Sequence, residues 1–247
     1  MKRKILITGA AGRIGSFLTA QWVGRYDLAL TDVRPPKERY GFPFHQANLA
    51  DFDAIRPLCD GIDTVVHLGA DPSMEATWES LLPNNLIATY NVFESAHQAG
   101  CRRILFASSV NAVLGYPPDV QVHSNMPIRP INLYGATKVW GEAVASSYAA
   151  RTNLSCICLR FGWVVDRNSD QLRLDHQYID ITFTYEDLAR LVTAAIEAPD
   201  SLKYKVFHGV SNNRWKRLDI SEARELLGYE PQDDGFELAK QRAQAHA

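Results

Sequence analysis

The sequence predicts an α/β fold built on a doubly wound parallel sheet, and three observations support that prediction. Short apolar runs alternate with longer helical patterns as far as Arg160. Each run is almost continuously apolar, as is typical of parallel strands that helices cover on both faces. A glycine-rich turn follows the first run directly, and an aspartate ends the second. Alternating strands and helices of this kind form open parallel sheets.

The expected strands are five short apolar runs, at residues 5–7, 28–31, 64–68, 104–107 and 156–159. The helices expected between them span residues 13–25, 53–59, 84–99 and 134–151. Gly100 follows the third helix, where a left-handed residue commonly ends a helix.

Beyond Arg160 the pattern is irregular, until a helix expected over 186–197 and another that ends at Gly228. A chain of 247 residues suffices for one large α/β domain and is too short for two ordinary ones. We therefore expect one domain, in which residues 161–247 form a small C-terminal cap on the region 1–160.

Composition excludes several classes of partner. Apolar residues make up 46% and charged residues 22%, as in soluble globular proteins. The formal net charge of −2 favours neither nucleic acid nor a membrane surface. No apolar run approaches the roughly 18 residues of a membrane-spanning helix.

The cysteines and histidines show no metal-ligand spacing, so no metal site is predicted. Cys59, Cys101, Cys156 and Cys158 are expected to be reduced, buried residues of a cytoplasmic protein. His67 lies in an apolar run and is expected to be a hydrogen-bonded core residue.

The glycine-rich turn at residues 8–15 follows a strand and opens a helix, the context in which such a motif binds a dinucleotide. Gly9 permits the tight turn, Gly12 lets the backbone approach a pyrophosphate, and Gly15 allows close helix packing. The helix N-terminus favours the anion. Asp32, at the end of the second strand, is placed to bind the ribose hydroxyls and to repel a 2′-phosphate, which favours NAD over NADP. Arg34 lies nearby and softens that preference.

Tyr134 and Lys138 are four residues apart on an expected helix, so both side chains lie on one face. A phenol titrates near pH 10 and is a poor base at neutral pH. We expect the ammonium group of Lys138 to lower the pKa of Tyr134. With the glycine turn, the pair indicates an enzyme that moves a hydride while a tyrosine handles the proton.

Together these motifs resemble the extended short-chain dehydrogenase/reductase family, also called the NAD-dependent epimerase/dehydratase family. The matches are T-G-A-A-G-R-I-G at 8–15, Asp32, H-L-G-A at 67–70, A-S-S at 107–109 and Y-G-A-T-K at 134–138. The resemblance implies a Rossmann-like doubly wound parallel sheet, with an NAD-binding region at 1–160 and a small C-terminal substrate cap at 161–247.

The resemblance also implies a Ser-Tyr-Lys mechanism. Ser109 would hydrogen-bond the substrate hydroxyl, Tyr134 would take its proton, and Lys138 would also hold the nicotinamide ribose. The loop after Ser109 is one residue longer than the family pattern, which leaves Ser108 as an alternative. The implied cofactor-binding residues are Gly9, Ala11, Gly12, Arg13, Ile14, Gly15, Asp32, Asn48, Leu49, Leu68, Gly69, Ala70, Asn85, Ala107, Tyr134 and Lys138.

More narrowly, the chain resembles uronate dehydrogenases and an archaeal NAD-dependent glucose-6-phosphate dehydrogenase, through residues 67–85, L-R-F-G at 159–162 and the tail after Gly209. Such enzymes oxidise the anomeric carbon of a sugar to a lactone. The resemblance implies Ser73 and Arg160 as substrate contacts, with Arg160 at an anionic group; the alternative for Arg160 is a structural ion pair. Asn111 either faces the substrate pocket or is an ordinary loop residue.

Three functions stay open from the sequence. The first is an NAD-dependent dehydrogenase acting on a sugar, a uronic acid or a sugar phosphate. The second is a sugar epimerase that holds NAD tightly, and the third is a catalytically silent dinucleotide-binding sensor. The resemblance further implies a homodimer through the helices at 84–99 and 134–151.

Overall fold

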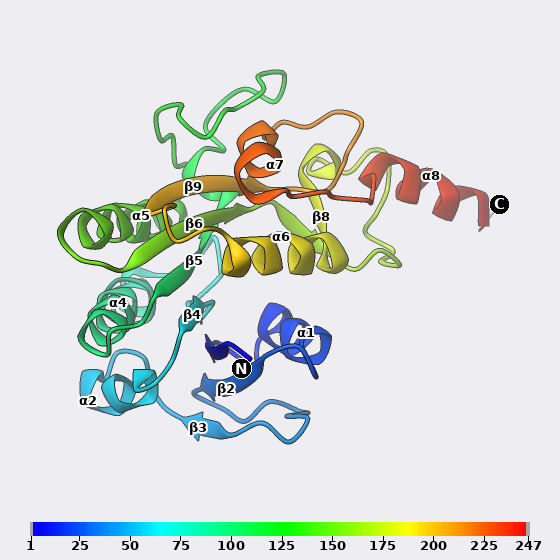
Figure 1. Cartoon of the computed structure of the whole chain (residues 1–247). Helices are drawn as coiled ribbons and strands as arrows, with labels where there is room; N and C mark the ends of the chain where they lie inside the picture. The colour runs from blue at the N-terminus through cyan, green and yellow to red at the C-terminus, as the bar shows by residue number, and fades with distance from the viewer. Residues whose placement is uncertain (1, 246–247) are drawn as a thin grey trace.

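Seven strands form one parallel sheet in the computed structural model, which describes residues 2–245 (Figure 1). Their order across the sheet is β3-β2-β1-β4-β5-β6-β9. The strands are β1 (Lys4–Thr8), β2 (Asp27–Asp32), β3 (Phe44–Gln46), β4 (Thr64–His67), β5 (Arg103–Ser109), β6 (Ser155–Phe161) and β9 (Tyr204–Gly209). The doubly wound parallel sheet and its five expected strands are confirmed. The short edge strand β3 and the last strand β9 were not predicted.

Helices cover both faces of the sheet (Figure 1). One face carries α1 (Arg13–Gln21) and α6 (Tyr185–Glu197), and the other carries α2 (Phe52–Ile55), α4 (Ala88–Gln98) and α5 (Leu133–Arg151). Side chains of a strand alternate between faces, so Ile5 and Ile7 pack with the first layer while Leu6 packs with the second.

The C-terminal region shares the main core. Its strand β9 pairs with β6, so the sheet is completed by residues beyond the predicted boundary at 160. Two short strands, β7 (Trp163–Val165) and β8 (Thr182–Thr184), pair in parallel and form a separate two-stranded sheet. The remaining helices, α7 (Ser221–Leu227) and α8 (Gly235–Ala245), follow β9.

The helix expected over 84–99 begins earlier than predicted. It is a continuous helical segment made of α3 (Trp78–Leu81), a π-helical turn at Leu82–Ile87 and α4. A π-helical turn widens the backbone and changes which side chains face inward; such turns are frequent at functional sites. Here the turn contains Asn85, which is buried.

Helix α5 lies unusually close to β5. A Cβ atom on Gly141 would lie 2.1 Å from Cζ of Phe106, a strand residue beneath the helix. Only glycine therefore allows this approach. The close contact sets the position of the helix that carries Tyr134 and Lys138.

The chain winds outward from the middle of the sheet in both directions. From β1 it passes to β2 and β3, and it then returns to β4 and continues through β5, β6 and β9. The carboxyl ends of β1 and β4 thus flank the point where the winding reverses. Ligands of doubly wound sheets bind at this point. Among residues 2–245 there is no helix of the length and apolar character that crossing a bilayer requires.

Candidate active site

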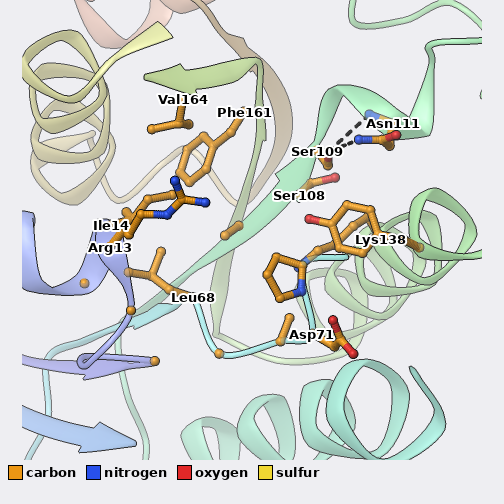
Figure 2. Close-up of a pocket in the computed structure, with 18 of the residues that line it drawn as sticks. Arg13, Ile14, Leu68, Asp71, Ser108, Ser109, Asn111, Lys138, Phe161 and Val164 are labelled. Carbon is orange, nitrogen blue, oxygen red and sulfur yellow. Dashed lines mark hydrogen bonds between the residues drawn. The ribbon is translucent and has the colours of Figure 1, made fainter. Parts of the chain in front are cut away.

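A cavity of about 820 Å³ opens at the carboxyl edge of the sheet, where the winding reverses (Figure 2). It is lined by the segments that follow β1, β4 and β5 and by the start of α5. Most of the residues that the sequence predicts for the site line it. They are Gly9, Gly12, Arg13, Ile14, Gly15, Asp32, Asn48, Leu49, Leu68, Gly69, Ala70, Ala107, Ser109, Asn111, Tyr134 and Lys138.

The glycine turn forms a backbone cradle at one side of the cavity. Gly9 has φ of +69°, and a Cβ there would lie 2.8 Å from the backbone nitrogen of Gly69. Gly12 is the N-cap of α1, offers no side chain to cap it, and is followed by a first turn without an acidic residue. The first N–H groups of α1 are therefore available to an anion, and Arg13 adds positive charge.

Asp32 lies at the end of β2 and lines the cavity. One carboxylate oxygen, Oδ2, accepts a hydrogen bond of 2.9 Å from the backbone N–H of Ala11, which fixes the side chain beside the glycine turn. Each carboxylate oxygen has lone pairs left for further donors. These features fit a dinucleotide with its pyrophosphate at α1 and a ribose at Asp32.

Tyr134 and Lys138 share one face of α5, as predicted: the ammonium nitrogen of Lys138 lies 5.5 Å from the ring centre of Tyr134. The expected lowering of the Tyr134 pKa is not found. Burial raises the pKa of Tyr134 to about 12, against a smaller opposing effect of its hydrogen bond with Ser109. Burial also lowers the pKa of Lys138 to about 8. The phenol is buried too deeply for the ammonium group to dominate.

Ser109 ends β5 and is held by a short network of amides. Its Oγ accepts hydrogen bonds of 3.1 Å from both the backbone N–H and the side-chain Nδ2 of Asn111. Oδ1 of Asn111 accepts in turn from Asn132, whose own Oδ1 caps α5 at Gly135. Because N–H donors use the acceptor positions of Ser109, its O–H is the group left to donate, and its partner in this structure is Tyr134. The cap of the helix and the orientation of Ser109 are thus linked.

Ser108, the alternative serine, is engaged elsewhere. Its Oγ donates a hydrogen bond of 2.6 Å to Glu142. Glu142 also accepts two hydrogen bonds of 2.8 Å from the guanidinium group of Arg160. The hydroxyl beside Tyr134 therefore belongs to Ser109.

For Arg160, this geometry favours the alternative of a structural ion pair over the expected contact with the substrate. Arg160 is 3% exposed, does not line the cavity, and forms a bidentate ion pair with Glu142. Its remaining Nη1 lies 3.4 Å from Nε2 of His208. Nδ1 of His208 contacts the carbonyl of Asp219, and burial lowers the pKa of this imidazole to about 3. A neutral His208 thus donates from Nδ1 and accepts from Arg160 at Nε2.

Three other predicted residues do not line the cavity. Ala11 turns its N–H to Asp32, and Ser73 lies on the exposed loop after β4. Asn85 is buried and ties that loop to α5: its amide bonds both backbone groups of Asp71 and also donates to Thr137. Asn85 therefore positions neighbours of the cavity. His67 is confirmed as a hydrogen-bonded core residue, and burial lowers its pKa to about 3.

Several lining residues were not predicted, although some of them lie in the segments 67–85 and 159–162 that carry the resemblance. Those farthest from the glycine turn come from the loop after β4 and from the segment after β6. The many aromatic residues after Phe161 were a sequence signal for the wall that the segment after β6 forms. The unpredicted residues include Asp71, Pro72, Met74, Asn84, Leu114, Phe161, Gly162, Trp163, Val164, Tyr178 and Tyr185.

Comparison with known proteins shows the family of the chain. Residues 5–179 match the model of the "NAD dependent epimerase/dehydratase family". An NAD-dependent glucose-6-phosphate dehydrogenase of Haloferax volcanii is 32% identical over 96% of both chains. An L-arabinose 1-dehydrogenase (NAD(P)+) of the same organism is 30% identical over 94% of this chain and 97% of that protein. The crystal structure of an Agrobacterium tumefaciens uronate dehydrogenase variant complexed with NAD superposes with a TM-score of 0.87 at 29% identity, covering 99% of this chain and 90% of that one.

Proposed function

The chain belongs to the NAD-dependent epimerase/dehydratase family, and from this premise we propose that it is an NAD-dependent dehydrogenase that oxidises the anomeric hydroxyl of a sugar to a lactone. The relatives that match it from end to end are named dehydrogenases of sugars or sugar derivatives. The observation that carries the proposal is the meeting of Ser109, Tyr134 and Lys138 at one end of a cavity whose other end has the dinucleotide cradle.

The proposed chemistry assigns a role to each group. Bound NAD supplies the hydride acceptor. The O–H of Ser109, which contacts Tyr134 in the unliganded site, donates to the oxygen of the reacting hydroxyl group and fixes its position. Tyr134, as the phenolate, accepts at Oη the proton that this hydroxyl loses, a general-base role that typically contributes about 10²- to 10⁴-fold in rate.

Lys138 supports that proton transfer. Its ammonium group is buried and lies 5.1 Å from the ring centre of Phe106 and 5.5 Å from that of Tyr134. No carboxylate of residues 2–245 forms an ion pair with it, so its charge remains directed at the cavity. A positive charge here favours the phenolate form that Tyr134 needs before it can take up the proton, and the ammonium group is placed to hold a ribose hydroxyl.

Net formation of NADH separates this proposal from its alternatives. Purified protein is mixed with NAD and a panel of aldoses, uronates and sugar phosphates, and NADH absorbance is followed. A dehydrogenase accumulates NADH and forms a lactone. An epimerase retains NAD through purification and interconverts sugars without net NADH. A silent sensor binds NAD but does neither, and that result would refute the proposal.

A homodimer is part of the same proposal. Large apolar side chains are exposed on or beside α4 and α5, namely Ile87, Tyr90, Leu133 and Trp140. Light scattering of the purified protein tests this directly, and Trp140→Glu is expected to yield monomers. The four free, buried cysteines support a reducing compartment such as the cytoplasm.

A further inference from the structure

The charges near the reacting hydroxyl are not those that an anionic sugar needs. Among the described residues, the cations that line the cavity are Arg13, Arg34 and Lys138. Arg13 begins α1 and Arg34 follows Asp32, so both belong to the cofactor cradle. Figure 2 shows Arg13 on the opposite side of the cavity from Lys138. At the substrate end, the described part of the chain thus supplies Lys138 alone.

Asp71 lies at the same end of the cavity as Lys138 (Figure 2). Its carboxylate accepts hydrogen bonds from two neutral donors, the N–H of Ser73 at 3.0 Å and the hydroxyl of Ser80 at 2.5 Å. It forms no ion pair within residues 2–245, so its negative charge is not neutralised by a neighbour. That charge reaches the reacting region, because it contributes to raising the pKa of Tyr134.

The position of Asp71 is fixed relative to the catalytic helix. The Asn85 amide accepts from the backbone N–H of Asp71 at 2.8 Å and donates to its carbonyl at 3.1 Å. The same amide donates to Thr137 at 3.0 Å, and Thr137 lies between Tyr134 and Lys138 on α5. The backbone of Asp71 is therefore tied to α5 by a buried link, while Ser73 and Ser80 hold its carboxylate.

We propose that Asp71 makes this site select neutral sugars and reject uronates and sugar phosphates. This inference rests on the proposed sugar dehydrogenase function. An anionic group at this end would lie near an unneutralised carboxylate and would share the single ammonium group of Lys138, and a poorly paired charge in a buried site is costly. Arg160 offers no relief, because Glu142 already pairs with it.

The rest of this wall suits a neutral sugar. Asn84 and Asn111 supply amide groups that hydrogen-bond hydroxyls, and Pro72, Leu114 and Trp163 supply apolar surface for the C–H faces of a sugar ring. Repulsion between two like charges weakens the binding of the wrong ligand and adds little to the binding of the right one. Asp71 thus acts through its charge.

Sugar binding to the NADH-saturated protein tests the inference without turnover. Calorimetry compares matched pairs that differ only at carbon 6, D-glucose with D-glucuronate and D-galactose with D-galacturonate, with D-glucose 6-phosphate as a third anion. We expect at least one neutral sugar to bind about tenfold or more tightly than its uronate. Raising salt from about 0.02 M to about 0.5 M should narrow that ratio, because screening weakens the repulsion.

Asp71→Asn is the decisive variant, with Asp53→Asn as its control. Asp53 is exposed on α2, outside the cavity, and its replacement changes the net charge by the same amount. We expect Asp71→Asn to shrink the neutral-to-uronate ratio about tenfold, mainly by tightening uronate binding, and Asp53→Asn to leave it unchanged. A purely structural role of Asp71 would weaken both sugars alike and leave the ratio constant, which would overturn the inference.

The two proposals fail in different ways. Tighter binding of a uronate or of glucose 6-phosphate by the unmodified protein, or no measurable binding of any probe, overturns selection by Asp71. If neutral sugars bind with the expected ratio but no NADH forms from NAD, the selection stands and the dehydrogenase function fails.

Discussion

Arg160 and Glu142 form a bidentate ion pair inside the protein, with both N–O distances at 2.8 Å and both side chains almost fully buried. The pair joins β6 to α5, the helix that carries Tyr134, and it also accepts the hydroxyl hydrogen of Ser108. Its role is therefore to hold the catalytic helix on the sheet.

Breaking that pair should cost stability more than it affects sugar choice. Arg160→Ala leaves Glu142 buried without a partner, a change that typically costs about 3–5 kcal/mol. We expect this loss in the free energy of unfolding, measured by urea denaturation. The double variant Arg160→Met with Glu142→Leu should recover most of it. The opposite result would be an Arg160→Ala protein of normal stability whose KM rises only for anionic sugars. That result would support the prediction from the sequence that Arg160 binds an anionic group of the substrate.

Tyr134→Phe should lower turnover about 10²- to 10⁴-fold, because it removes the proton acceptor. Binding of NADH, measured by fluorescence titration, should be unchanged, since the cradle at the glycine turn is intact. Tyr148→Phe is the matched control, because Tyr148 lies on the same helix and its hydroxyl bonds Glu94 outside the cavity. Equal activity of the two variants would mean that another group is the base.

Lys138→Met should abolish turnover and stabilise the protein at neutral pH. Burial lowers the Lys138 pKa from 10.5 to about 8, which corresponds to a cost of about 3 kcal/mol while the folded protein keeps the proton. As pH rises through 8, the folded protein loses this proton, while the unfolded chain keeps it to about 10.5. Unfolding then takes up a proton. The free energy of unfolding of the wild type therefore rises relative to that of the variant between pH 8 and 10.5. Urea denaturation of both proteins across this range measures the effect, and a constant difference would contradict it.

Asn132→Asp separates the two tasks of Asn132. The carboxylate still caps α5 at Gly135 but cannot donate to Asn111. We expect an unchanged melting temperature and a fall in kcat of about 5- to 30-fold, as for the loss of 1–2 kcal/mol in orienting Ser109. Asn132→Ala, which removes the cap too, should also lose about 1 kcal/mol of stability. A fully active Asn132→Asp enzyme would show that this amide network does not orient Ser109.

Asp32 should set the cofactor preference. We expect kcat/KM to favour NAD over NADP, and Asp32→Ala to relax the ratio about tenfold or more, because the repulsion and the hydrogen bonds to the ribose are both lost. Initial rates with each cofactor measure the ratio. A strong NADP preference of the unmodified enzyme would overturn this assignment.

The sequence predicted the central sheet because buried parallel strands are continuously apolar. It missed β3, whose residues Phe44, His45 and Gln46 are mostly polar and lie at the edge of the sheet. The glycine turn and Asp32 were predictable because backbone geometry demands particular residues there. The individual residues of the wall after Phe161 were not predictable, although the substrate cap was expected there, since these side chains meet only once the chain has folded.

Arg160 shows a different reason for error. Ser108 lies opposite Arg160 in the paired strands, and Ser109 lies opposite Phe161. Side chains alternate between faces, so Ser109 and Phe161 face the cavity, while the hydroxyl of Ser108 and the guanidinium group of Arg160 turn toward Glu142. Ser108 still contributes to the cavity lining, and Arg160 does not. The motif at 159–162 correctly located the end of β6. Whether a side chain there faces the cavity or Glu142 depends on a shift of one residue along the strand.

The lack of a side chain at Gly141 affects the candidate site as well as the packing of α5. Because α5 rests on the Phe106 ring at this point, the spacing between helix and sheet fixes the depth of Tyr134 and Lys138 together. We expect a larger residue at 141 to force either the Phe106 ring or this turn of α5 to move, and a movement of α5 would shift both groups. The geometry of the site thus depends on a residue that does not itself line the cavity.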